Sequence, residues 1–138
     1  MTVPGDDPSV RDEDALLRRV PNRPRLLADD GKGGTRPSSA ALELRDGEDG
    51  CSVDVRRLLP NPATPLTSLT GCPTGWGLAT FTAADARHEA QHHVARAWLE
   101  DNPAHALVLP TAASRSARKR NFSRLARTMQ WIQPPEME

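Results

Sequence analysis

Residues 38–55 have the sequence SSAALELRDGEDGCSVDV, and the order of apolar and polar side chains in this stretch is the main guide to the fold. Leu42 and Leu44 alternate with polar residues, and Val53 and Val55 do the same further along. Alternation with a period of two is typical of strands that bury one face. The intervening DGEDG contains residues that tolerate a tight reversal. We therefore expect a β-hairpin whose inner face carries these four apolar side chains.

More strands and two helices are predicted on either side of this hairpin. Short apolar runs indicate strands over residues 15–20, 76–81, 94–100 and 104–109, although the first run also fits a single helical turn. A capping box of Thr82 and Asp85 predicts a helix over residues 83–92, and a period of 3.6 predicts a second over residues 113–131. These elements favour an α+β fold, with a small antiparallel or mixed sheet of about five strands covered by two helices. The alternative is a three-layer α/β arrangement built around residues 76–99.

Length and composition limit the chain to one small domain. It has 138 residues, of which 25 are Leu, Ile, Val or Phe, and 13 prolines and 9 glycines interrupt regular structure. The first fourteen residues contain five acidic side chains and few apolar ones. We therefore expect residues 1–14 to be a disordered acidic segment, residues 15–133 to form a single α+β domain, and residues 134–138 to form a short tail.

Charge and cysteine content predict a cytoplasmic protein. The 18 basic and 18 acidic side chains cancel, so no overall field draws the molecule to nucleic acid or an anionic membrane. Apolar runs are too short for a membrane span, and no secretory signal pattern is present, so no membrane partner is expected. Cys51 and Cys72 match no metal or redox spacing, which predicts reduced thiols. The excess of Arg over Lys and the abundant Ala indicate a high-GC bacterial genome.

Residues 88–92, HEAQH, match the pattern H-E-x-x-H. On a helix, His88 and His92 would share one face and bind zinc, while Glu89 would act as the general base. This segment resembles the zincin metallopeptidase signature, which implies a zinc-dependent hydrolase. The resemblance covers five residues, and the glycine and histidine of the extended metzincin pattern are missing. We therefore prefer a solvated helix face with no catalytic residue and no cofactor, and keep a zinc hydrolase as the alternative.

The predicted C-terminal helix carries a basic face. Arg120, Arg124 and Arg127 lie on one side of the helical projection, with Trp131 beside them. Such a face favours binding to an acidic surface of another protein or to a second copy of this chain. Tracking of nucleic-acid phosphates is the alternative. These four residues are the predicted partner-binding site.

The remaining polar and aromatic candidates are interpreted as structural. His105 lies between apolar residues, which favours a hydrogen-bonded, partly buried histidine. Trp76 and Trp98 lie within predicted strands and are assigned to the core, whereas Trp131 is the predicted surface anchor.

Three stretches, PSSAALELRDGEDGCSVDV, TFTAADAR and DNPAHALVLP, resemble short bacterial proteins to which no activity is assigned. The resemblance rests mainly on the serine-led hairpin ending in SVDV and on the DNPAHALV turn. It implies neither a metal site nor an activity. The sequence as a whole therefore predicts a small accessory or regulatory protein that acts by protein–protein binding and is not an enzyme.

Overall fold

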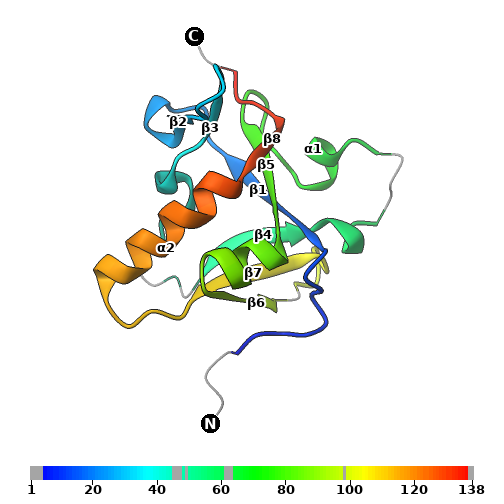
Figure 1. The fold of residues 1–138 in the computed structure, drawn as a ribbon. Coiled ribbons are helices and arrows are strands. Elements are labelled where there is room, and N and C mark those ends of the chain that lie inside the picture. The colour runs from blue at the N-terminus through cyan, green and yellow to red at the C-terminus, as the bar shows by residue number, and fades with distance from the viewer. Residues whose placement is uncertain (1–4, 45–47, 49, 61–63, 98, 137–138) are drawn as a thin grey trace.

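Within the residues that the structure describes, six antiparallel strands form a central sheet, and one long helix lies against it (Figure 1). The structure is a computed structural model and describes residues 5–44, 48, 50–60, 64–97 and 99–136. The strands are β1 (Ala15–Val20), β2 (Leu27–Asp29), β3 (Thr35–Pro37), β4 (Cys51–Val55), β5 (Gly77–Thr82), β6 (His92–Arg96), β7 (His105–Pro110) and β8 (Gln130–Gln133). The helices are α1 (Leu66–Leu69) and α2 (Arg115–Thr128), with 3-10 helices η1 (Pro24–Leu26), η2 (Ser39–Leu42) and η3 (Arg56–Leu58) and a π-helical turn η4 (Asp85–Glu89).

The strands of the central sheet lie in the order β6-β7-β4-β1-β5-β8, and β2 pairs with β3 in a separate small sheet. Every strand pair that the structure describes is antiparallel. The predicted α+β class is therefore confirmed, although the described residues form six strands plus two instead of about five. The three-layer α/β alternative is wrong, because β5 and β6 are not neighbours in the sheet.

Only the second arm of the hairpin predicted over residues 38–55 is a strand. β4 buries apolar side chains as expected, but the first arm forms the 3-10 helix η2. Leu42 is fully buried at the end of η2, and Leu44 is half-buried just beyond it. Alternation over so few residues fits a helical turn as well as a strand. Residues 46, 47 and 49 of the predicted tight turn, and residue 45 before it, lie outside the described residues.

The helix predicted over residues 83–92 begins as expected and ends early. Asp85 N donates a hydrogen bond to Thr82 Oγ1 (3.0 Å), and Thr82 N donates one to Asp85 Oδ2 (3.1 Å), so the capping box is present. The π-helical turn ends at Glu89, and Gln91 has a φ of 57°. A left-handed residue ends a helix, and β6 begins immediately after it. The last predicted helical turn is therefore wrong.

The helix α2 corresponds to the C-terminal helix predicted over residues 113–131, and it is shorter than predicted. Ser114 Oγ accepts a hydrogen bond from Ala117 N (3.2 Å) and caps its first turn. Met129 is already extended, with φ −72° and ψ 142°, and the chain continues as β8. Trp131 therefore lies on a strand beside β5 instead of on the helix. Neither α2 nor any other helix among the described residues has the length and apolar character of a membrane span.

The apolar core lies between α2 and the face of the sheet that α2 covers. The helix contributes Phe122, Leu125, Ala126 and Met129. The sheet contributes Leu16, Val20, Cys51, Val53, Val55, Ala79, Phe81, Val94, Ala106 and Val108. Burying one large apolar side chain fully contributes roughly 1.5–3 kcal/mol to stability. Ile132 is 38% exposed and lies on β8, beyond the helix.

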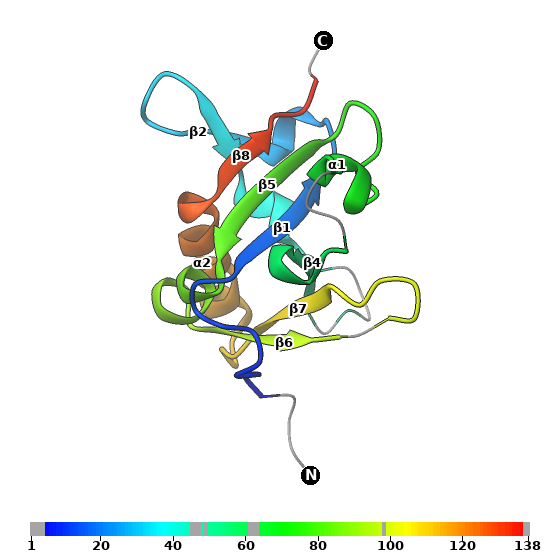
Figure 2. The same ribbon diagram turned by 90° about the vertical axis from the view of Figure 1, so that its right-hand side faces the viewer.

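The sheet divides into two halves between β1 and β4. In the described register these strands pair at only two positions, Leu16 with Val55 and Leu17 with Asp54. In contrast, β1 pairs with β5 along all six of its residues. Figure 2 shows that β1, β5 and β8 run in a different direction from β6 and β7. The two halves therefore separate beyond their short contact and leave a gap.

Residues 5–14, which we call the N-terminal strap, lie along the outer edge of β6. Asp7 N donates a hydrogen bond to Val94 O (2.9 Å), and Val94 N donates one to Asp6 Oδ1 (2.9 Å). Because β6 is the last strand of the sheet, the strap satisfies backbone groups of an edge strand. The sequence predicts disorder over residues 1–14, whereas the strap makes these contacts. Residues 1–4 lie outside the described part of the chain.

Candidate functional site

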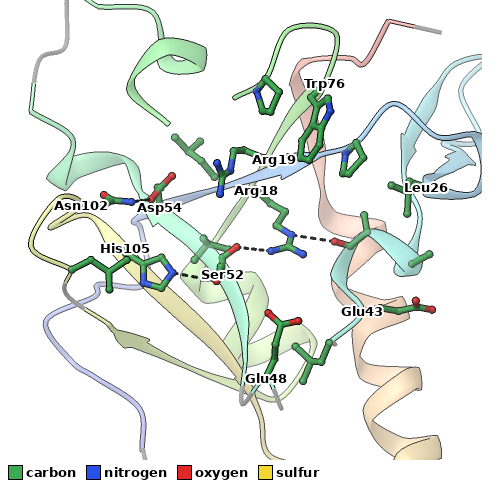
Figure 3. Close-up of a pocket in the computed structure, with 18 of the residues that line it drawn as sticks. Arg18, Arg19, Leu26, Glu43, Glu48, Ser52, Asp54, Trp76, Asn102 and His105 are labelled. Carbon is green, nitrogen blue, oxygen red and sulfur yellow. Dashed lines mark hydrogen bonds between the residues drawn. The ribbon is translucent and has the colours of Figure 1, made fainter. Parts of the chain in front are cut away.

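A groove of about 570 Å³ opens where β1 and β4 separate (Figure 3). Its polar lining consists of Arg18, Arg19, Arg25, Glu43, Glu48, Ser52, Asp54, Asp101, Asn102 and His105. Its apolar lining includes Leu17, Leu26, Leu44, Trp76 and Leu99. Charges of both signs converge on a concave surface here, which is typical of a site for a polar ligand.

Arg18 spans the gap between the two halves of the sheet. Arg18 Nε donates a hydrogen bond to Ala41 O (3.1 Å), and Arg18 Nη1 donates one to Ser52 O (2.8 Å). Ser52 lies beyond the described pairs of β4 with β1, so the guanidinium takes the place of a strand partner for this carbonyl. The same contact fixes a positive charge beside Ser52 in the wall of the groove (Figure 3).

Ser52 and His105 form a hydrogen-bonded pair across β4 and β7 (Figure 3). His105 Nε2 lies 3.2 Å from Ser52 Oγ, and His105 Nδ1 lies 2.9 Å from Ala97 O. A carbonyl oxygen only accepts, so Nδ1 carries the ring proton and Nε2 accepts from the serine hydroxyl. Both side chains are half-buried and line the groove. The hydrogen-bonded histidine expected from the sequence is therefore paired with a serine on an accessible surface.

Asp54 and Asn102 fix the surroundings of this pair. Asn102 Nδ2 donates a hydrogen bond to Asp54 Oδ1 (2.8 Å), and Asn102 Oδ1 accepts one from Ala104 N (3.2 Å). Asp54 is buried and lies directly opposite His105 in the register of β4 and β7. The turn that precedes β7 is thereby tied to β4, which holds the imidazole in place over the groove.

Comparison with known proteins does not assign this arrangement. No family model, curated protein or solved structure matches this chain.

The structure separates the two histidines of the HEAQH segment. His88 and Glu89 are exposed on η4. His92 lies on β6, is 2% exposed and packs against Phe122, with ring centroids 4.6 Å apart. The zinc hypothesis needs both histidines on one helical face, and the helix ends before the second one. Among the described residues, no three His, Cys, Asp or Glu side chains are grouped to hold a metal ion.

His88 instead belongs to a cluster that fastens the N-terminal strap. His88 Nε2 lies 3.0 Å from Asp12 Oδ2, and this hydrogen bond is the main cause that lowers the pKa of Asp12. Arg87 Nε donates to Asp6 Oδ1 (2.8 Å), and Arg87 Nη1 donates to Asp12 Oδ1 (2.9 Å). The Arg87 side chain is only 10% exposed, so this arginine is enclosed by the strap. Asp6 and Asp12 belong to the segment that the sequence predicts to be disordered, yet both form contacts with η4.

His92 is a core residue without a role in the groove. Neither of its ring nitrogens has a hydrogen-bond partner among the described residues. Burial lowers the pKa of His92 to about 4, an effect that the nearby backbone of Asn121 offsets only in part. The imidazole is therefore neutral at physiological pH and behaves as an aromatic side chain beneath α2.

The two cysteines are free thiols and show no activation. Burial raises the pKa of Cys51, which is 1% exposed on β4, and burial also raises the pKa of Cys72. Both thiols are therefore protonated at neutral pH, and neither has the lowered pKa of a catalytic cysteine.

The helix α2 presents positive charges without compensating negative ones. Its charged residues, all of them exposed, are Arg115, Arg118, Lys119, Arg120, Arg124 and Arg127. Within the described chain, none of these six forms an ion pair. The three predicted arginines, Arg120, Arg124 and Arg127, are all exposed as expected for the outward side of the helix.

Trp131 lies at the C-terminal end of α2 and is half-buried. Its Nε1 donates a hydrogen bond to Thr35 Oγ1 (3.3 Å). Together with Arg127 it lines a hollow of about 650 Å³ beside β2 and β3, which Asp29 and Asp30 also line. The structure thus places Trp131 and Arg127 in the lining of one hollow, but it does not place Trp131 on the helix.

The sequence did not identify the pairing of Ser52 with His105. Both residues occupy polar positions that alternate with apolar residues along predicted strands. This alternation is the only local signal that their side chains lie on the face away from the core. Which strands become neighbours, and in which register, depends on the whole sheet. Of the two tryptophans predicted in the core, Trp76 is half-buried beside the groove, and Trp98 lies outside the described residues.

Proposed function

We propose that this protein is a small accessory or regulatory protein that binds an acidic surface of another protein through Arg120, Arg124 and Arg127. The observation that supports this proposal is the uncompensated positive charge of α2 among the described residues. Soluble proteins usually intersperse charges of both signs on exposed faces. A helix face of one sign attracts a partner of the opposite sign and sets its orientation.

A protein partner fits this face better than nucleic acid does. The molecule as a whole has no net charge. Asp29 and Asp30 border the hollow at the Arg127 end of the face, where a phosphate backbone would meet them. A folded protein can present carboxylates to the arginines and a neutral surface to the hollow. The half-buried ring of Trp131 then adds an apolar contact at the same end.

Binding to two labelled probes of equal net charge tests the proposal. The probes are a polyglutamate peptide and a DNA duplex. Their binding is measured by fluorescence anisotropy at low and at physiological salt concentration. Replacing Arg120, Arg124 and Arg127 by Ala removes the three exposed ion pairs that these arginines form with the bound peptide. Each such pair is worth about 0.2–1 kcal/mol, so the affinity for the peptide should fall about tenfold. The wild-type protein is expected to prefer the peptide.

A matched control separates this face from general electrostatics. Arg11, Arg23 and Arg56 are exposed residues on other elements, and replacing all three by Ala removes the same charge. We expect this variant to keep most of the peptide affinity. Equal losses in the two variants would refute a specific role for the α2 face. Tighter binding of the duplex than of the peptide would replace the proposal with nucleic-acid binding.

A further inference from the structure

We propose that Ser52 and His105 are the nucleophile and general base of an acyl-transfer site that hydrolyses small esters. This inference does not depend on the α2 face, because the groove is lined by other elements. It rests on the hydrogen-bonded arrangement of three groups: the Ser52 hydroxyl, the His105 imidazole and the Ala97 carbonyl oxygen.

The order of these groups matches what nucleophilic catalysis needs. The nucleophile must lie within hydrogen-bond reach of the base, and a third group must orient the base. Ser52 Oγ is 3.2 Å from His105 Nε2, and Ala97 O holds Nδ1 at 2.9 Å. The tautomer is therefore the one in which Nε2 is free to take the serine proton.

The third group also limits the substrate. In a serine protease a carboxylate stabilises the imidazolium that forms, whereas Ala97 offers only a carbonyl dipole. The carboxylate of Asp54 lies on the same strand face as His105, but Asn102 engages one of its oxygens. A base supported in this way suits leaving groups that depart easily. We therefore assign esters, and not amides, as the substrate class.

Arg18 fixes a positive charge at the backbone of the residue that carries the nucleophile. Its Nη1 donates to the main-chain carbonyl oxygen of Ser52 at 2.8 Å, and Arg18 also lines the groove. Positive charge fixed close to a reacting acyl group favours the oxyanion that forms in acyl transfer. The groove is open, and much of its lining is charged or polar, so it fits a short acyl group better than a long aliphatic chain.

The reaction proceeds in two balanced steps. Ser52 Oγ attacks the carbonyl carbon of the ester while its proton passes to His105 Nε2. The bond from that carbon to the alcohol oxygen breaks, and His105 returns the proton to the departing alcohol. Water then attacks the acyl-serine and gives a proton to Nε2. The acid leaves, and Ser52 Oγ takes back the proton.

Labelling and kinetics on the intact protein test this proposal. A fluorophosphonate probe should add once, and peptide mass spectrometry should locate the adduct on Ser52. Hydrolysis of p-nitrophenyl acetate should begin with a burst of one equivalent, because the acyl-serine accumulates. Loss of the base in His105→Gln should slow acylation by roughly 10²-fold or more.

Two serine variants make the test specific. Ser52→Ala should abolish the adduct and the burst, whereas Ser68→Ala, which changes an exposed serine on α1, should leave both unchanged. Failure of wild-type protein to label at Ser52 would overturn the proposal, and this result needs no variant to fold. Ester hydrolysis that survives in Ser52→Ala but not in His105→Gln would also overturn it, because the histidine alone would then be reacting.

Discussion

His92 should make this protein less stable as the pH falls from neutral. In the folded state its ring is 2% exposed, and burial lowers its pKa to about 4. In the unfolded chain a histidine has a pKa of about 6.5. Between these two values the unfolded state binds a proton that the folded state does not bind. The free energy of unfolding therefore decreases as the pH falls through this window.

The size of this effect follows from the difference between the two pKa values. Each pH unit in the window costs about 1.4 kcal/mol. The loss is about 2 kcal/mol between pH 7 and pH 5 and approaches about 3 kcal/mol near pH 4. Carboxylates with lowered pKa values, such as that of Asp14, add their own losses only at lower pH. The interval from pH 7 to pH 5 therefore isolates the histidine.

Urea denaturation followed by tryptophan fluorescence at pH 7 and pH 5 measures this loss. His92→Gln and His92→Phe both remove the titrating group. In these variants the free energy of unfolding should change little between pH 7 and pH 5. His93→Gln changes the neighbouring residue on β6, which is half-buried, and should retain the full dependence. A His92 variant that loses as much stability as the wild type between these pH values would refute the argument.

Three further perturbations test other parts of the structure. Asp14 is 4% exposed and accepts two hydrogen bonds from Arg57, so Asp14→Asn should cost about 1–3 kcal/mol in urea denaturation at pH 7. This cost should shrink in acid as the wild-type carboxylate, whose pKa is lowered chiefly by Arg57, becomes protonated. Gly77→Ala would place a Cβ 2.7 Å from the Trp131 ring and should lower thermal stability by about 1–3 kcal/mol with a change in fluorescence. Arg87→Ala should release the strap and speed hydrogen exchange at the Val94 amide about tenfold, and unchanged exchange would contradict the strap contacts.

Local sequence patterns were sufficient to predict several elements of the structure. The capping box of Thr82 and Asp85 is a local contact, and it is confirmed. The apolar side of α2 was also predictable, since its period depends only on the helix itself. Alternation identified β4, where Cys51, Val53 and Val55 repeat, whereas the first arm had only Leu42 and Leu44, and its η2 turn was mistaken for a strand.

The remaining features depend on contacts between distant segments. The end of η4 follows from the backbone of Gln91, and nothing in the residue type alone requires its positive φ. Helical periodicity continues through Trp131, yet pairing with β5 draws that residue into a strand. The pairing of Ser52 with His105 arises from the register of β4 with β7, and Arg18 fills a gap that exists only because the sheet divides. The candidate site is therefore a product of topology more than of motif.

The way in which the strap covers β6 has a consequence for behaviour in acid. Part of its contact with the strand uses carboxylate oxygens: Val94 N donates to Asp6, and Arg96 N donates to Asp7. The hydrogen bond from the Ser9 side chain is the main cause that lowers the pKa of Asp7. The contact between Asp7 and β6 therefore persists at pH values below the usual pKa of an aspartate. Once Asp7 takes up a proton, the Arg96 amide on this edge strand loses its charged acceptor and is open to other molecules. Acid-induced self-association of this protein should therefore involve pairing at the edge of β6.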